Sequence, residues 1–568
     1  MNAGEIVGQT LKLYDAEYLF GFSGGDHPFL LGILDAGIKY VLTHSERSAV
    51  AMADAYARAT GKPSFAYAQW GPGAALAVSG VADAFWAQSP VVCITTSLSS
   101  ASLYRNAYQS IDEQRALFEP LTKWNALVPN IQRLPDMMRQ AIRMAVGGVP
   151  GPVHIDIPQE LSRSASQTLE GVELYAESDF KKFPAQRVGP EACAIDRVIA
   201  VIRQAKRPLI LAGGGVIASE AWDELIQLAE ALSIPVVTSS AGKACMPTDH
   251  PLLVGGIGNY SRKVANDVIA RSDVCIVVGS NLGDHTTKSR QALAPSAKIV
   301  HIDLDPGVLG NTYREEVSVL GDAKLTLKSI MDAAETEGLL KKVHPWADWV
   351  KEVQAMVKSW KAAFQEKAKD GGKPGSINPY FVIATLNRLI SPDDVVVVDT
   401  GYMGAFGNAL IDVKSPGRKY IRTPGSLGCG FPESLGVQCA VKNRGRVICL
   451  SGDGGIGYHV SDIETAVRCN LPVVVLILNN STLAFTHHMF KLGYKRPAPQ
   501  VTDYLDIDYG AVSRAFGAHG EKVMEAKDVE AALKRAFDSG RPAIVDIAVD
   551  KETYAPVIFY EPFERREV

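Results

Sequence analysis

Short runs of β-branched and aliphatic residues recur along the chain, each followed by a glycine-rich turn and then by a stretch with helical spacing of its apolar positions. An uninterrupted apolar run is typical of a strand that is buried on both faces. Strands of this kind alternating with helices predict parallel sheets covered by helices on both sides. The expected strands are Val91–Thr96, Val153–Ile157, Leu209–Ala212, Val274–Gly279, Ile299–Leu304, Val395–Asp399, Val447–Ser451, Val473–Asn479 and Ile544–Val549.

Two polar stretches interrupt this rhythm and mark domain boundaries. One covers about residues 164–190, and the other covers about 334–379, where the chain is charged and partly helical and ends in a Gly-Lys-Pro-Gly segment. The blocks between them have ordinary domain size. We predict three α/β domains with parallel sheets flanked by helices, over residues 1–165, 188–333 and 376–552, followed by a C-terminal tail or lid over 553–568.

Composition narrows the class of protein. The chain has 568 residues, 47% hydrophobic and 21% charged, with a formal net charge of −4, so a nucleic-acid partner is not expected. No apolar run reaches the roughly 18–20 residues that a membrane span needs, and the N-terminus lacks the features of a signal peptide. None of the eight cysteines forms a Cys-x-x-Cys pair, which favours buried thiols in a reducing cytoplasm.

The strongest candidate for chemistry lies in the third block. Gly452-Asp453-Gly454 follows one predicted strand, and Asn479-Asn480 follows the next, with a predicted helix between the two strands. The carboxyl ends of neighbouring parallel strands meet at the sheet edge where open α/β sheets bind ligands. A generic glycine-rich turn is the alternative for Gly-Asp-Gly alone, but the complete unit favours a binding site.

The chemistry of this unit points to a metal and a phosphate group. Carboxylate and amide oxygens suit Mg²⁺, which commonly shares its oxygen ligands with phosphates. Glycines allow the backbone to approach a diphosphate closely, and the N-terminus of a helix favours its negative charge. The predicted metal ligands are Asp453, the Asn480 side chain and the backbone carbonyl of Thr482.

The Gly-Asp-Gly…Asn-Asn unit resembles the signature of the thiamin-diphosphate enzymes, and the resemblance extends over nearly the whole chain. Within that family the sequence is similar to the acetolactate synthase and benzaldehyde lyase group. The segments Gly425-Ser-Leu-Gly-Cys-Gly-Phe-Pro-Glu-Ser-Leu-Gly436 and His301-Ile-Asp-Leu-Asp-Pro306 look particularly like cyclohexane-1,2-dione hydrolase. The resemblance implies a pyrimidine-binding, a Rossmann-like central and a diphosphate-binding domain, in that order, and the cofactors thiamin diphosphate and Mg²⁺.

The resemblance also implies roles for individual residues. Tyr40-Val-Leu-Thr-His-Ser-Glu46 matches the family's strand and His-Glu pair, with Ser45 as an extra residue, and assigns Glu46 to the catalytic carboxylate that hydrogen-bonds the aminopyrimidine ring. Leu427 matches the apolar side chain that wedges between the cofactor rings; a core leucine is the alternative. The implied cofactor-binding residues are Gly401, Tyr402, Gly425, Ser426, Leu427, Gly452, Asp453, Gly454, Gly455, Ile456, Asn480, Thr482 and Leu483.

The substrate pocket is expected to draw on loops of the first domain and on the segment after Asn480. Gln109 matches a glutamine near the reacting centre of the acetolactate synthase group. His27 and His487 are further catalytic candidates, because imidazole titrates near neutral pH. His487 and His488 are consecutive on a predicted helix and cannot both face the cofactor. Gln69 stands where benzoylformate decarboxylases have a histidine, which weakens a simple decarboxylase interpretation.

The central domain leaves three alternatives. Leu211-Ala-Gly-Gly-Gly215 and His301–Asp305 are similar to segments that hold FAD in acetolactate synthases or ADP in oxalyl-CoA decarboxylase relatives. However, Gly279–Gly283 lacks the arginine usual in the family, which puts FAD in doubt. FAD, ADP and no nucleotide all remain open.

These observations predict a thiamin-diphosphate-dependent lyase or carboligase that forms or cleaves a C–C bond beside the carbonyl of a 2-oxo acid or 2-hydroxyketone, similar to acetolactate synthase. One alternative is a 2-hydroxyacyl-CoA lyase that releases formyl-CoA, with Phe559–Arg566 in a C-terminal lid. A non-catalytic regulatory subunit is another, although Glu46, Asp453 and Asn480 together argue against it. The resemblance implies a homodimer or homotetramer with active sites at the subunit interface, a small carbonyl substrate, and no membrane partner.

Overall fold

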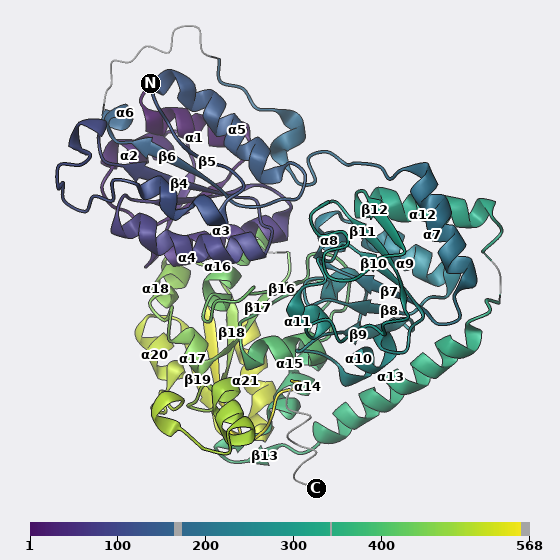
Figure 1. Cartoon of the computed structure of the whole chain (residues 1–568). Helices are drawn as coiled ribbons and strands as arrows, with labels where there is room; N and C mark the ends of the chain where they lie inside the picture. Colours follow the sequence, from purple (N-terminus) through teal and green to yellow (C-terminus); the bar gives the residue numbers. More distant parts are fainter. Residues whose placement is uncertain (164–172, 341–342, 443, 558–568) are drawn as a thin grey trace. The chain divides into compact units, whose positions relative to one another are not determined.

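The computed structural model describes residues 1–163, 173–340, 343–442 and 444–557, which form two compact units (Figure 1). The first unit combines Met1–Gln186, Thr423–Asn443 and Tyr458–Val473. The second combines Arg187–Arg422, Arg444–Gly457 and Val474–Val568. Each unit therefore draws on separate stretches of the chain. The predicted lid segment from residue 558 onward and part of the first predicted linker, 164–172, lie outside the described residues.

A six-stranded parallel sheet forms the centre of the first unit, in the order β2-β1-β3-β4-β6-β5. Its strands are β1 (Tyr18–Gly21), β2 (Lys39–Leu42), β3 (Ser64–Ala68), β4 (Val91–Ser97), β5 (Asn125–Leu127) and β6 (Val153–Pro158). Its helices from the N-terminal stretch are α1 (Ala3–Leu13), α2 (His27–Asp35), α3 (Glu46–Thr60), α4 (Pro72–Trp86), α5 (Leu134–Val146) and α6 (Glu160–Arg163).

Two helices of the first unit come from much later in the chain, namely α16 (Gly430–Val441) and α18 (Asp462–Arg468). Helix α16 packs directly against the backbone of α3. A Cβ atom at Gly436 would lie 2.1 Å from the carbonyl oxygen of Met52, so only glycine permits this approach. The helix that begins with Glu46 is therefore covered by residues more than 350 positions away.

The second unit contains two further six-stranded parallel sheets. The order of one is β12-β11-β10-β7-β8-β9, and the order of the other is β16-β15-β17-β18-β20-β19. The strands of the first are β7 (Pro208–Ala212), β8 (Val236–Thr238), β9 (Leu253–Gly256), β10 (Val274–Val278), β11 (Lys298–Asp303) and β12 (Val317–Leu320). Those of the second are β15 (Val395–Val398), β16 (Tyr420–Arg422), β17 (Val447–Gly452), β18 (Val474–Asn479), β19 (His519–Val523) and β20 (Ala543–Ala548).

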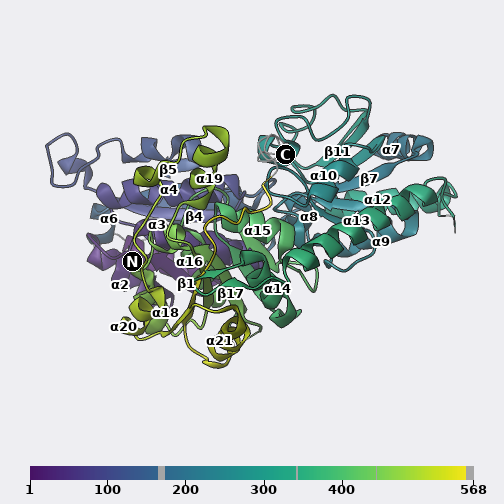
Figure 2. The same ribbon diagram turned by 90° about the horizontal axis from the view of Figure 1, so that it is seen from below.

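Helices and one short hairpin complete the second unit. The helices are α7 (Ala192–Gln204), α8 (Gly214–Ala218), α9 (Trp222–Leu232), α10 (Lys263–Ile269), α11 (Asp284–Thr287), α12 (Ala323–Thr336), α13 (Ala347–Lys367), α14 (Pro379–Leu389), α15 (Tyr402–Leu410), α17 (Asp453–Ile456), α19 (Ala484–His488), α20 (Tyr509–Ala515) and α21 (Ala526–Asp538). The hairpin pairs β13 (Gly372–Lys373) with β14 (Ser376–Ile377). Figure 2 shows α13 as one continuous helix, so the second predicted linker is largely helical.

The fold confirms the predicted α/β class, with parallel sheets flanked by helices. All nine predicted strands are present, each within one or two residues of the expected ends. The strand implied before the His44–Glu46 segment is β2, whereas the polar strand β19 was not predicted, because it is not a continuous apolar run. Within the described part of the chain, no helix combines the length and the apolar character required to cross a membrane.

Candidate active site

Asp453 and Asn480 lie at the carboxyl ends of two adjacent parallel strands. Strands β17 and β18 are paired in register from Ile448 with Val474 to Gly452 with Leu478. Asp453 is the next residue after β17 and the first residue of α17, and Asn480 follows the last residue of β18. The structure therefore brings the two predicted metal ligands to one edge of the sheet, as the strand–turn–helix–strand pattern indicates.

The carboxylate of Asp453 has the environment of a cation ligand. It is 5% exposed, and its Oδ2 atom makes no hydrogen bond with the residues that the structure describes. Burial raises the pKa of Asp453 to about 6, while the backbone amides of Asp453, Asn480 and Gly454 oppose that rise. A buried carboxylate oxygen without a partner is costly unless a ligand pairs with it. The donor set therefore fits Mg²⁺, with Asp453, Asn480 and the Thr482 carbonyl as the predicted ligands.

Glycines leave open space beside the backbone at this sheet edge. A Cβ atom built at Gly401, where φ is +79°, or at Gly452 would have no described heavy atom within 4 Å. Gly401 also precedes α15, so the amides at the start of that helix border this space. Gly455 has a different reason to be glycine, because its Cβ would lie 2.2 Å from Oδ2 of Asp399. Gly401 and Gly452 therefore fit a cradle for a diphosphate.

Buried polar residues that the sequence analysis missed support the Asn-Asn turn. The Asn479 amide donates to Oδ1 of Asp546 at 3.0 Å, and Oδ2 of the same carboxylate accepts from the Tyr509 amide at 2.9 Å. The Tyr509 hydroxyl donates to the backbone carbonyl of Asp453 at 3.1 Å. Asp546 is the acidic residue in the otherwise apolar strand β20, and that position was the signal by which it could have been found.

Thr482 and Leu483 extend the same turn. The Thr482 hydroxyl donates to the carbonyl of Thr502 at 3.1 Å, and the Leu483 amide donates to the same carbonyl at 2.8 Å. A Cβ at Gly454 would lie 2.9 Å from Cδ2 of Leu483, so the two residues pack closely. Ile456 is fully buried. Thr482, Leu483 and Ile456, three of the predicted cofactor-binding residues, therefore lie around the Asp453 turn.

Glu46 is held in the first unit as the first residue of α3. Ser45 is the N-cap, and its hydroxyl oxygen accepts from the Ser48 amide at 3.1 Å. The Glu46 side chain is 3% exposed, and burial raises the pKa of its carboxyl above the ordinary value. A surface glutamate that merely favours the helix dipole would be exposed. The burial of Glu46 therefore agrees with its predicted role as the catalytic carboxylate, and that role stays a prediction.

The first turn of α4 lies against the Glu46 carboxyl, with the Gln69 side chain beside it. A Cβ at Gly73 would lie 2.7 Å from Oε1 of Glu46 and 2.7 Å from Cγ of Gln69. A Cβ at Gly24 would lie 2.1 Å from Oε1 of Gln69. The Gln69 side chain therefore lies between the Gly24 loop and Gly73 in the first turn of α4, and both glycines leave room for it beside Glu46.

Gln109 lies against the start of α4 through its backbone. Its φ is +60°, and a Cβ at Gly71 would lie 1.9 Å from the Gln109 carbonyl oxygen. The buried Gln114 fixes this contact, because its Oε1 accepts from the Gly71 amide at 2.7 Å and its Nε2 donates to Asp156 at 3.0 Å. Sequence reasoning missed Gln114. His27 begins α2 with an exposed side chain, so its catalytic role stays a prediction.

The segment that carries the predicted wedge residue also lies in the first unit. The Leu427 carbonyl accepts from Nη2 of Arg47 at 3.0 Å, and the Ser426 amide donates to Asp83 at 3.2 Å. A Cβ at Gly425 would have no described heavy atom within 4 Å. Leu427 is partly exposed rather than part of a core cluster, which favours the wedge over the alternative of a core leucine.

The structure distinguishes the two consecutive histidines after the Asn-Asn turn. His488 is fully buried, and its Nδ1 is hydrogen-bonded to the Tyr402 hydroxyl. Burial lowers the pKa of His488 to about 4, so its ring is neutral near pH 7. His487 instead lies 3.5 Å from Oε1 of Glu552, which also pairs with Lys491 at 2.7 Å. His488, rather than the predicted His487, is the histidine coupled to a predicted cofactor-binding residue.

The glycine-rich turn of the central domain has a packing explanation. A Cβ at Gly213 would lie 2.0 Å from the carbonyl oxygen of Gly279, and one at Gly215 would lie 2.7 Å from the Gly279 Cα. His301 is likewise engaged, with Nδ1 2.6 Å from Glu315 and Nε2 2.8 Å from the Ser280 carbonyl. These glycines are required by the contact between two loops, and they carry no separate argument for a nucleotide.

Comparison with known proteins gives the same picture from independent data. Residues 1–117 match the description "Thiamine pyrophosphate enzyme, N-terminal TPP binding domain", residues 195–330 match its central domain, and residues 399–547 match its C-terminal TPP binding domain. Thiamine pyrophosphate, or TPP, is another name for thiamin diphosphate. The matches follow the predicted domain order, whereas the exact predicted boundaries stay a prediction.

Several curated relatives cover almost the whole chain. The probable acetolactate synthase large subunit of Methanocaldococcus jannaschii is 30% identical over 98% of this chain and 93% of its own length. The acetolactate synthase large subunit of Haemophilus influenzae is 29% identical over 98% and 95%. Isozyme 3 of Escherichia coli, again a large subunit, is 28% identical over 97% and 95%. The chain therefore belongs to the thiamine pyrophosphate enzymes, in the group of the acetolactate synthase large subunits, and is a thiamin-diphosphate-dependent C–C lyase or carboligase.

Proposed function

We propose that this enzyme binds thiamin diphosphate through Mg²⁺ at the edge formed by β17 and β18, and acts on 2-oxo acids or 2-hydroxyketones. The observation that carries the proposal is the buried Asp453 carboxylate, whose Oδ2 atom has no hydrogen-bond partner among the described residues. A divalent cation would stabilise its charged form. The names of the relatives, all acetolactate synthases, favour this substrate class over a 2-hydroxyacyl-CoA lyase or a regulatory subunit.

In this proposal, the side chains of Asp453 and Asn480 and the carbonyl of Thr482 hold the metal. Gly401, Gly452 and the amides at the start of α15 would hold the diphosphate. Asp546 and Tyr509 hold the turn in place by bonding Asn479 and the Asp453 carbonyl. Thiamin diphosphate, when bound, supplies an electron sink for breaking or forming the bond beside a carbonyl.

Glu46 holds and releases a proton beside the aminopyrimidine ring. Its raised pKa brings the carboxyl closer to neutral pH, where a group can both give and take a proton. Leu427 would contact the rings of the bound cofactor, and Gln109 would orient the substrate. His27 and His487 are the proposed proton-transfer groups, and the neutral ring of His488, held by Tyr402, lies against the His487 ring with 5.2 Å between the ring centroids.

We also propose that the chain is a cytoplasmic homodimer or homotetramer, in which Glu46 of one subunit serves the cofactor bound to the other. The relatives are named large subunits, which supports association but fixes no number of copies. FAD, ADP and an empty central domain remain alternatives. Light scattering would give the mass of the assembly, and the absorption spectrum of the purified protein would reveal a flavin.

Turnover of the enzyme loaded with Mg²⁺ and thiamin diphosphate tests the substrate class. The panel contains pyruvate, benzoin, cyclohexane-1,2-dione and 2-hydroxyacyl-CoA thioesters, with carbon dioxide and aldehyde as readouts. Carbon dioxide release with a coupled hydroxyketone is the expected result. Thioester cleavage without carbon dioxide would replace the proposal with the acyl-CoA lyase. Binding of the cofactor without Mg²⁺ would contradict the role of Asp453.

A further inference from the structure

The residues around Glu46 include one more than the family pattern has, because Ser45 stands between His44 and Glu46. Ser45 has extended backbone angles and caps α3, with its hydroxyl oxygen accepting from the Ser48 amide at 3.1 Å. Its hydroxyl also lies 3.1 Å from the Ser48 hydroxyl. The extra residue is thus absorbed as an N-cap, and His44 precedes it outside the helix.

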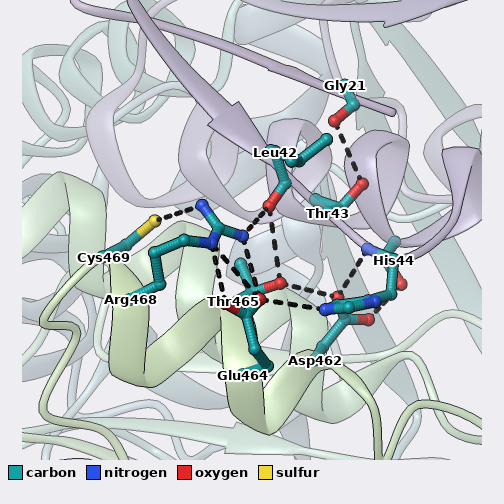
Figure 3. A network of polar contacts seen from close by, with 10 residues as sticks. Gly21, Leu42, Thr43, His44, Asp462, Glu464, Thr465, Arg468 and Cys469 are labelled. Atoms are coloured by element: carbon teal, nitrogen blue, oxygen red, sulfur yellow. Dashed lines mark hydrogen bonds and ion pairs between the residues drawn. The ribbon is translucent and has the colours of Figure 1, made fainter. Parts of the chain in front are cut away.

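One carboxylate from α18 binds the chain on both sides of Glu46. Oδ1 of Asp462 accepts from the His44 amide at 3.0 Å, and Oδ2 accepts from the Ser48 hydroxyl. Figure 3 shows Asp462 and His44 among the contacts between α18 and the end of β2. Residues 44 and 48 flank Glu46 by two positions each, so Asp462 fixes the segment that carries the Glu46 side chain.

This contact is buried and electrostatically favourable. Ser48, Asp462 and His459 are 0%, 1% and 5% exposed. Nδ1 of His459 lies 2.8 Å from the Ser48 hydroxyl. Burial alone would raise the pKa of Asp462, but the His459 ring, 3.6 Å from its Oδ2, and the bond from the Ser48 hydroxyl outweigh it and lower that pKa. Asp462 is therefore a charged acceptor near neutral pH, and charge-assisted bonds to it are strong.

A second layer of contacts joins α18 to the same stretch at the surface. Nε2 of His44 lies 2.9 Å from Glu464, and Arg468 donates to the Leu42 carbonyl at 2.6 Å (Figure 3). His44 and Glu464 are each 39% exposed, and exposed pairs of this kind contribute little. The buried Asp462 contact is therefore the one that determines the geometry, and the Glu464 pair offers a control on the same helix.

We infer that Asp462, supported by His459, is a positioning residue for Glu46, because it fixes the start of α3 from both sides. The inference rests on the proposed function, because it gives Asp462 a role only if Glu46 moves the cofactor proton. A carboxyl displaced by about 1 Å from its working position is expected to lose roughly 100-fold in rate.

The first measurement is made on the intact protein without cofactor. Amide hydrogen exchange over residues 44–48 is compared in the wild type, Asp462→Ala and Glu464→Gln. Loss of the buried acceptor frees the His44 amide and the Ser48 hydroxyl, so exchange over this segment should accelerate at least tenfold in Asp462→Ala. Glu464→Gln should stay within twofold of the wild type. Equal protection in Asp462→Ala and the wild type would overturn the inference.

The second measurement uses the enzyme loaded with Mg²⁺ and thiamin diphosphate. The rate at which the thiazolium C2 proton exchanges with deuterium should fall about 100-fold in Asp462→Ala, and by less in Asp462→Asn, which keeps one oxygen for the His44 amide. The asparagine variant also serves if the alanine variant does not fold. An unchanged rate in both variants would overturn the inference while leaving the role of Glu46 intact.

A Glu46→Gln variant separates the two hypotheses. If it exchanges the C2 proton at the wild-type rate, the proposed function of Glu46 fails, and the inference about Asp462 fails with it. If it abolishes exchange and Asp462→Ala slows it, both stand. The pH profile adds a readout that a purely structural role would not move. A Glu46 carboxyl released from its buried position, near the Tyr40 and Tyr67 hydroxyls, should show an acid limb at lower pH.

Discussion

The Asp453 turn and the start of α3 are built in different ways. The first is a continuous strand–turn–helix–strand unit whose two ligands belong to neighbouring strands. The second depends on two other stretches of the chain, since Gln69 and Gly73 from one and Asp462 from the other surround Glu46 or its flanks. The residues of a site built from one continuous segment can be predicted from the sequence. Where tertiary contacts build the site, the sequence predicts the central residue, here Glu46, but not the residues around it.

The largest expected effect on kcat comes from a substitution of Glu46 at the start of α3. Glu46→Gln removes the carboxyl that holds and releases the proton, so kcat should fall by about 10²–10⁴-fold, the usual contribution of a general acid or base. Cofactor affinity and thermal stability should change little, because glutamine preserves the shape. Steady-state turnover and calorimetric titration of the cofactor check this. Full activity in the variant would remove Glu46 from the mechanism.

Gly73→Ala tests whether the close packing of α4 against Glu46 and Gln69 matters as much as the Glu46 carboxylate itself. The new Cβ would lie 2.7 Å from Oε1 of Glu46 and 2.7 Å from Cγ of Gln69, so one of them has to move. We expect a loss of roughly 100-fold in kcat, with cofactor binding retained. Gly189→Ala is the matched control, because its Cβ would meet no described atom within 4 Å. Wild-type turnover in Gly73→Ala would show that the site tolerates movement.

Asp546→Asn probes the support of the first region. One of its two acceptor oxygens becomes an amide group that faces either Asn479 or the Tyr509 amide, so a donor meets a donor. The Mg²⁺-dependent affinity for thiamin diphosphate should fall about 10–100-fold, as for other residues that hold metal ligands in place. Asp538→Asn, at an exposed position on α21, serves as the control. Unchanged affinity would mean that the turn needs no such support.

The smallest effect concerns the pH dependence of stability in the second region. Burial raises the pKa of Asp156, the partner of Gln114, to about 6 from 3.8. The folded state therefore binds this proton more tightly than the unfolded state, and the free energy of unfolding should rise as the pH falls from above 6 to below 4. Two pKa units correspond to about 3 kcal/mol.

Asp156→Asn should remove this contribution. Denaturant unfolding of the variant and the wild type at several pH values measures the difference between them. The free energy of unfolding of the wild type should increase relative to that of Asp156→Asn between pH 7 and pH 4. Parallel pH curves for the two proteins would contradict the raised pKa.

Features that depend on local sequence could be predicted, whereas features that depend on tertiary contacts could not. The α/β class, nine strands and the meeting of Asp453 with Asn480 are local consequences of apolar runs and a glycine turn, and the structure confirms each of them. The partners of His487 and His488 could not be predicted from the sequence, because Tyr402 and Glu552 reach these rings only in the folded chain, and the catalytic role of His487 stays a prediction. Gln114 and Asp462 look like ordinary polar residues until the fold brings them to their partners.

The discontinuous composition of the first unit has a consequence for synthesis of the protein. Met1–Gln186 leaves the ribosome first, but α16 and α18, which complete the unit, lie in Thr423–Asn443 and Tyr458–Val473. At about 5–20 residues per second, these helices emerge roughly 15–60 s later. Throughout that interval the face of α3 that receives Gly436 has no partner from α16, so this face of the nascent N-terminal stretch stays uncovered until α16 emerges.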